Sequence, residues 1–344
     1  MNRVASDLEP YLRGCSWPAG AGVPYPRADP DDFTRLPIDT WGTAQLPVGV
    51  RLEFVGNASA VSITYRTETD NLGYRGPGAG STFSLWRHGV RVDEQPAVLG
   101  KGTVRLTTGD LSSDRRGVVY LPEGMRPHVL SIAAEDGAIE PAPAQPRWLC
   151  YGDSIAEGWV ASGPARAWPA IVGREVGLDV CNLGYAGSAR GEIVSAEHLA
   201  SIPADVISIS HGTNCWTRVP HSTGMVREGM LAFLTTVRQG HRDTPIVVAS
   251  PVLRPDAEQT PNRLGATLTD VRNAIEAVVH ERIAAGDHRL ELIPGAPLLS
   301  AAHLPDGIHP GDDGHAVLAR VIGPVVAGAF ERARPARPGL QATR

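Results

Sequence analysis

A serine, a histidine and an aspartate in this 344-residue sequence occur in settings that suit acyl transfer. Ser154 follows Gly152 and Asp153 where a short apolar run ends, and His309 comes three residues after Asp306 in a glycine-containing turn. A serine hydroxyl attacks an ester only when a base takes its proton, and a third group must hold that base in the correct tautomer. We therefore predict Ser154 as the nucleophile, His309 as the base and Asp306 as the residue that orients His309.

Acyl transfer also needs hydrogen-bond donors for the oxyanion that develops in the transition state. The candidates are the backbone N–H of Ser154, the backbone N–H of Gly187 in "NLGYAGS" and the side-chain amide of Asn214 in "HGTNCW". A glycine at position 187 lets substrate approach the backbone without a side chain in the way. These three groups form the predicted oxyanion hole.

The elements that must bring these residues together lie in the second half of the chain. Strand-like apolar runs cover 147–151, 178–182, 205–210, 245–250 and 290–293, and helical segments fall near 165–176, 190–200, 223–239, 263–285 and 312–332. This alternation without hairpins is typical of a parallel sheet with helices on both faces. Ligands bind such sheets outside the carboxyl ends of the strands, where the predicted residues lie.

The first half has a different pattern, with apolar residues at every second position from about 48 to 135. Short strands and frequent turns predict an antiparallel β-sandwich or jelly roll. Prolines at 141, 143 and 146 indicate an extended linker. We expect a β-sandwich domain at 1–140, a linker at 141–147, a catalytic domain at 148–334 and a tail at 335–344. The sandwich should lie against the catalytic edge and help to wall the substrate pocket.

Composition and charge restrict the partners. A net charge of −5 offers no basic field for nucleic acid. The sequence contains neither an apolar run long enough for a membrane span nor a secretory signal pattern, and its four cysteines are far apart. We therefore expect a cytoplasmic protein with reduced thiols and a small-molecule ester as substrate. No paired histidine and carboxylate spacing suggests a metal site, and no cofactor is expected.

Four blocks together resemble the SGNH (GDSL-type) hydrolase family. They are "GDSI" at 152–155, Gly187, "GTN" at 212–214 and "DGIHP" at 306–310, and the match covers about residues 147–332. The resemblance implies a flavodoxin-like three-layer α/β/α fold with a five-stranded parallel sheet, and the roles proposed above for Ser154, Asp306, His309, Gly187 and Asn214. In one departure, Cys215 occupies a position where the family commonly has aspartate.

Three functions follow from these blocks. A serine esterase, with water resolving an acyl-Ser154 intermediate, is narrowly preferred. The alternative is an acyltransferase that passes the acyl group to a hydroxyl of a small molecule such as a polyketide, as some family relatives do. A weaker alternative is a carbohydrate-binding protein with a vestigial hydrolase domain. His303 and His315 are rival bases, and Asp153 is predicted to cap a helix rather than to act in catalysis.

Overall fold

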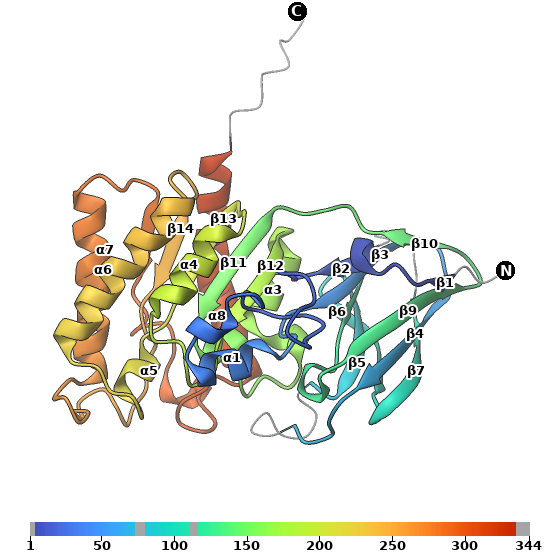
Figure 1. Ribbon diagram of the computed structural model, residues 1–344, viewed down its shortest axis with the longest axis horizontal. Helices are drawn as coiled ribbons and strands as arrows, with labels where there is room; N and C mark the ends of the chain where they lie inside the picture. The colour runs from blue at the N-terminus through green and yellow to red at the C-terminus, as the bar shows by residue number, and fades with distance from the viewer. Residues whose placement is uncertain (1–3, 73–79, 110–115, 335–344) are drawn as a thin grey trace, which may run out of the picture.

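The computed structural model describes residues 4–72, 80–109 and 116–334. Its first half contains two antiparallel sheets, which Figure 1 shows on the side of the N-terminus. One sheet has the order β1-β9-β4-β7, with bounds Val4–Ala5, His128–Glu135, Ala60–Thr67 and Gly100–Thr107. The other has the order β10-β3-β8-β5-β6, with bounds Ile139–Pro141, Arg51–Gly56, Gly117–Tyr120, Thr82–Arg87 and Val90–Pro96, and β2 (Leu12–Arg13) pairs with β3.

Alternating side chains form the core between these two sheets. Val61, Ile63 and Tyr65 of β4 are buried in the same apolar cluster as Leu52 and Phe54 of β3. Successive side chains of a strand point to opposite faces, so a period of two places one apolar set between the sheets. The predicted antiparallel β-sandwich is confirmed.

The second half contains a parallel sheet of five strands, as the alternating pattern predicted. Its order is β12-β11-β13-β14-β15, with bounds Asp179–Gly184, Arg147–Gly152, Val206–Ser210, Ile246–Ala249 and Leu290–Ile293. The chain moves from β11 to β12 on one side and then crosses to β13 on the other, which is the flavodoxin-like order. The carboxyl ends of β11, β12 and β13 therefore lie side by side at the switch point, where such sheets bind ligands.

Helices cover both faces of this sheet and complete three layers (Figure 1). Buried side chains of α4 (Ile193–Ser201), α6 (Thr223–Gly240) and α7 (Leu268–Ala284) pack on one face. Those of α3 (Trp168–Val176) and α8 (Asp312–Ala333) pack on the other. The predicted three-layer α/β/α architecture is confirmed. Among the described residues, no helix has both the length and the apolar character needed to cross a membrane.

The predicted helix at 263–285 began too early, because α7 begins at Leu268. Residues 262–267 form a loop instead. The side-chain oxygen of Asn262 holds this loop, because it accepts hydrogen bonds from the backbone N–H groups of Leu264 and Ala266. Thr267 and Asp270 then make a capping box that starts the helix. Local side-chain hydrogen bonds decided this boundary, and apolar spacing does not report them.

The N-terminal segment 14–50, between β2 and β3, packs on the parallel-sheet half. Helix α1 (Ile38–Ala44) lies beside that half in Figure 1, where it is drawn in blue. Ala28, Leu36 and Ala44 are buried in the same apolar cluster as Tyr151 of β11. The residues expected as a linker, 141–147, connect the last residue of β10 to the first residue of β11, with neither helix nor strand between them.

Candidate active site

The predicted nucleophile lies on a sharp turn at the end of β11. Asp153 caps the short helix α2 (Ser154–Glu157), because its carboxylate accepts the N–H of Ile155 at 3.0 Å. A Cβ added to Gly152 would lie 2.5 Å from the hydroxyl oxygen of Ser210 and 2.6 Å from the Cβ of Ala156. Only glycine therefore lets the chain turn here and present Ser154 at the carboxyl-end edge of the sheet.

The structure brings Ser154, His309 and Asp306 into one hydrogen-bonded chain. The Ser154 hydroxyl lies 2.9 Å from Nε2 of His309, and Nδ1 of His309 lies 2.6 Å from Oδ2 of Asp306. The other carboxylate oxygen of Asp306 accepts the backbone N–H groups of Ile308 and His309. Partial burial acts to raise the pKa of Asp306, but the hydrogen bonds from His309 and Ile308 outweigh it and lower this pKa. An ionised carboxylate on Nδ1 leaves Nε2 free to accept the serine proton.

The rival histidines have other partners. Nδ1 of His303 accepts the N–H of Ser300, and His303 belongs to the turn before Asp306. His315 is fully buried, with its two ring nitrogens bonded to the Trp168 N–H and the Trp159 carbonyl. Both side chains are thus committed to holding backbone in place.

The predicted oxyanion donors lie on the loops that follow β11, β12 and β13. Among the described residues, neither the Ser154 nor the Gly187 backbone N–H has a hydrogen-bond acceptor. Gly187 has φ +71°, and a Cβ there would meet nothing within 4 Å, so glycine is favoured by backbone conformation rather than by space. The Asn214 side chain donates to the carbonyl of Ala189 at 3.2 Å, which ties the third loop to the second.

Cys215 takes part in the same connection. Its thiol lies 3.7 Å from the carbonyl of Arg190 and is buried. Burial raises the pKa of Cys215 to about 12, so the group stays a neutral thiol at physiological pH. The Cys215 thiol thus makes a weak contact with the loop after β12. The family that the sequence resembles commonly has a carboxylate at this position.

An aromatic ring also contacts the predicted base. Trp159 stacks on His309 with ring centroids 4.9 Å apart and an interplanar angle of 29°. The stacked indole therefore limits rotation of the imidazole, whose Nε2 lies 2.9 Å from the Ser154 hydroxyl. Trp159 follows Ser154 by five residues, and no spacing rule would have selected it.

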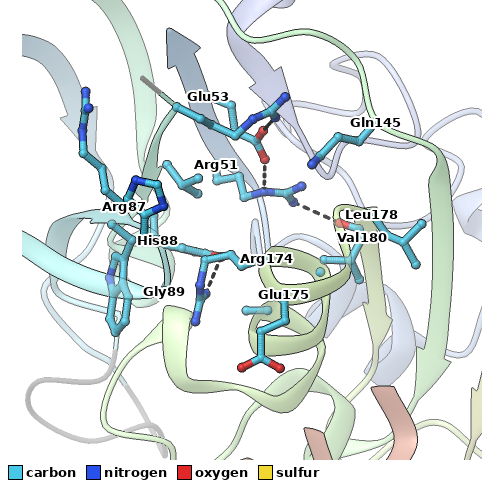
Figure 2. Close-up of a pocket in the computed structure, with 16 residues that line it drawn as sticks. Arg51, Glu53, Arg87, His88, Gly89, Gln145, Arg174, Glu175, Leu178 and Val180 are labelled. Atoms are coloured by element: carbon cyan, nitrogen blue, oxygen red, sulfur yellow. Dashed lines mark hydrogen bonds and ion pairs between the residues drawn. The ribbon is translucent and has the colours of Figure 1, made fainter. Parts of the chain in front are cut away.

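A separate polar cavity of about 410 Å³ lies between the two halves (Figure 2). It is lined by residues of the sandwich, among them Arg51 and Glu53, and by Arg174, Leu178 and Val180 around α3 and the start of β12. The start of β12 is the opposite end of the strand from the loop that carries Gly187. This cavity is therefore distinct from the candidate active site.

Residues 150–317 match the model of the GDSL-like Lipase/Acylhydrolase family. This match confirms the resemblance of the chain to that family of enzymes, also called SGNH or GDSL-type hydrolases.

Solved structures share the fold over almost the whole chain. A salicylyl-acyltransferase from a tetracycline biosynthetic pathway is 23% identical, covers 98% of this chain and 99% of its own, and has a TM-score of 0.81. A protein of Bacteroides ovatus assigned to the GDSL-like lipases is 22% identical, with coverages of 96% and 98% and a TM-score of 0.77. A family two carbohydrate esterase from Cellvibrio japonicus is 14% identical, with coverages of 97% and 99% and a TM-score of 0.61. No curated protein matches the chain in the sequence comparison.

Proposed function

We propose that the protein transfers acyl groups from carboxylic esters through an acyl-Ser154 intermediate, with water as the preferred acceptor. The observation that carries this proposal is the hydrogen-bonded chain Ser154–His309–Asp306, with distances of 2.9 and 2.6 Å. Its geometry agrees with that required for general-base activation of a serine.

The proposed reaction has two steps. The Ser154 oxygen attacks the ester carbonyl while its proton passes to Nε2 of His309, and the oxyanion is held by the N–H groups of Ser154 and Gly187 and by the Asn214 amide. The tetrahedral intermediate collapses, its C–O bond to the alcohol breaks, and His309 returns the proton to the departing alkoxide. Water then attacks the acyl-Ser154 ester by the reverse path and releases the acid and free enzyme.

A second acceptor is supported by one comparison. The salicylyl-acyltransferase shares the two-part fold over 98% of this chain. An acyl-enzyme can be attacked by an alcohol as well as by water, and the catalytic groups are the same in both cases. The alternative function is therefore transfer to a hydroxyl of a small molecule.

The two acceptors are separated by the products that the purified protein makes. We expect an activated acetate, such as 4-nitrophenyl acetate, to give free acetate as the main product even with simple alcohols and phenols present, measured by mass spectrometry. A new ester as the main product would favour the acyltransferase. Equal rates of ester cleavage with and without the protein would contradict both acyl-transfer functions. That outcome would favour the carbohydrate-binding alternative.

The capping aspartate gives a prediction about pH and stability. Burial raises the pKa of Asp153 to about 6, although the N–H of Ile155 and the charge of His309 act to lower it. A raised carboxyl pKa destabilises the fold as pH rises, because between about pH 4 and 6 the unfolded chain has lost a proton that the folded chain still holds. Asp153→Asn keeps a capping oxygen and removes this titration.

We therefore expect the free energy of unfolding of Asp153→Asn, relative to the unchanged protein, to increase between pH 4 and pH 7 by about 2 kcal/mol. Urea unfolding at a series of pH values measures this difference. Ser162→Ala, outside the turn, serves as the control and should show a difference independent of pH. A constant difference for Asp153→Asn would contradict the raised pKa.

A further inference from the structure

The loop 184–190 carries Gly187 and receives support from the N-terminal segment, a part of the chain that lies outside the family match. We infer that Arg27 is a positioning residue for the oxyanion hole, acting through Glu157 and the carboxyl end of β12. This inference rests on the proposed function, because it assumes that the Gly187 N–H binds the oxyanion.

Arg27 joins the N-terminal segment to the end of β12. Its side chain is 1% exposed. Within its own segment, Nε donates to the carbonyl of Leu46 at 2.6 Å and Nη2 donates to the carbonyl of Thr43 at 2.7 Å. Nη1 donates to the carbonyls of Asn182, at 3.2 Å, and Gly184. The planar guanidinium thus holds the last residues of β12, just before the loop, through hydrogen bonds of fixed direction.

Glu157 links Arg27 to the residue next to Gly187. Its carboxylate is fully buried, and its Oε2 accepts the backbone N–H of Ala186 at 2.8 Å. The same oxygen lies 3.8 Å from Nη2 of Arg27. A buried carboxylate without a compensating charge is strongly destabilising, and the Arg27 guanidinium supplies that charge beside the oxygen that holds the Ala186 amide. Glu157 also ends the short helix that begins with Ser154, which connects the nucleophile to the same pair.

Other contacts of the N-terminal segment reach the same loop. The Tyr185 hydroxyl donates to the carbonyl of Arg27, and the Thr43 and Ser188 hydroxyls lie 3.3 Å apart. Nη2 of Arg190 lies 2.7 Å from a carboxylate oxygen of Asp39 in α1 and donates to the Gly187 carbonyl at 3.0 Å. The loop therefore has contacts to this segment along its length, with the most buried of them at Arg27.

These contacts bear on catalysis through geometry. Oxyanion donors work because they are aimed in advance at the charge that develops, and a displacement of about 1 Å can cost on the order of 10²-fold in rate. Loss of Arg27 should therefore lower kcat, while KM, which depends on ground-state contacts, changes little. A purely structural role would lower stability without this selective effect on kcat.

Arg51 offers a matched control, because it is also a buried arginine that joins the two halves. It donates to Glu53 at 2.7 Å and to the carbonyl of Val180 at 3.1 Å (Figure 2). It also donates to Asp179, the first residue of β12, at 2.8 Å. Arg27 and Arg51 thus bond opposite ends of one strand. Arg27→Met and Arg51→Met should both lower the melting temperature, and only Arg27→Met should lower kcat selectively.

The experiment measures kcat and KM on an activated acetate, the melting temperature, and the affinity for an alkyl boronic acid, which forms a tetrahedral adduct. For Arg27→Met we expect kcat to fall about 10- to 100-fold with KM within about twofold, and boronate affinity to fall by a similar factor. Asn214→Ala, which removes a proposed donor, sets the scale. Glu157→Gln keeps an oxygen for the Ala186 N–H and should lose less than Arg27→Met, and Arg27→Lys should recover part of the rate.

The double variant Arg27→Met/Glu157→Gln should lose no more kcat than Arg27→Met alone, because the two residues act as one unit. If Arg27→Met does not fold, Arg27→Lys and Glu157→Gln carry the test through the same kcat and boronate measurements. Equal kcat losses in the Arg27 and Arg51 variants, or losses seen only in KM, would overturn the inference. Failure of the proposed function is distinguishable, because Ser154→Ala would then remain active.

Discussion

Ser154→Ala is expected to reduce turnover of an activated ester by on the order of 10⁶-fold and to abolish labelling by a fluorophosphonate. The substitution removes the oxygen that lies 2.9 Å from Nε2 of His309 and leaves the base without a group to activate. The fold should be retained, because the capping hydrogen bond of this turn is accepted by the Asp153 carboxylate and does not involve the Ser154 hydroxyl. Initial rates, intact-protein mass after labelling and the melting temperature measure the three parts of the prediction.

Ser162→Ala provides the matched control. Ser162 also lies in the segment after β11, but its hydroxyl donates to Asp312 at 2.7 Å and makes no contact with the predicted base. This variant should label and turn over like the unchanged protein. Labelling that persisted in Ser154→Ala would show that another residue is the nucleophile.

His309→Ala is expected to lose nearly as much activity as Ser154→Ala, because a serine without its base is a poor nucleophile. Residues that act as one unit have non-additive effects, so the double variant Ser154→Ala/His309→Ala should be no slower than either single variant. Asp306→Asn should lose the same amount or less, since the imidazole would keep its place but lose the carboxylate that selects its tautomer. Initial rates with a single activated ester measure all four variants.

His303→Ala is the control for the base. Its ring accepts a hydrogen bond from Ser300 in the preceding turn, so its removal should affect stability more than catalysis. A greater loss of activity in His303→Ala than in His309→Ala would mean that the base is wrongly assigned.

Most of the catalytic fold could be predicted because its signals are local. An apolar run such as that at β14 (Ile246–Ala249) is buried on both faces and stays apolar along its length. The five strands fell where these runs predicted them. The start of α7 was missed, because the side chain of Asn262 and the capping box at Thr267 decide it through hydrogen bonds that have no period.

Some residues of the candidate site could likewise be predicted from local motifs, and others could not. Ser154, Asp306, His309, Gly187 and Asn214 stand in short motifs whose residue types state their chemistry, and the structure places Ser154, His309 and Asp306 within hydrogen-bond distance of one another. Arg27 and Glu157 stand in no motif. An arginine in a proline-rich segment and a glutamate at a helix end look like ordinary surface residues until their burial is known.

The sequence by itself determined the proposed class of chemistry, because the predicted nucleophile, base and donors are recognised by residue type and by their place after successive strands. Only the tertiary structure decided what holds those groups in position. Arg27 and Gly184 are 157 residues apart, and their contact depends on how the N-terminal segment packs on the parallel-sheet half. Such contacts form when two stretches of chain that are distant in sequence pack against each other. The residue pattern of either stretch does not show which other stretch it will contact.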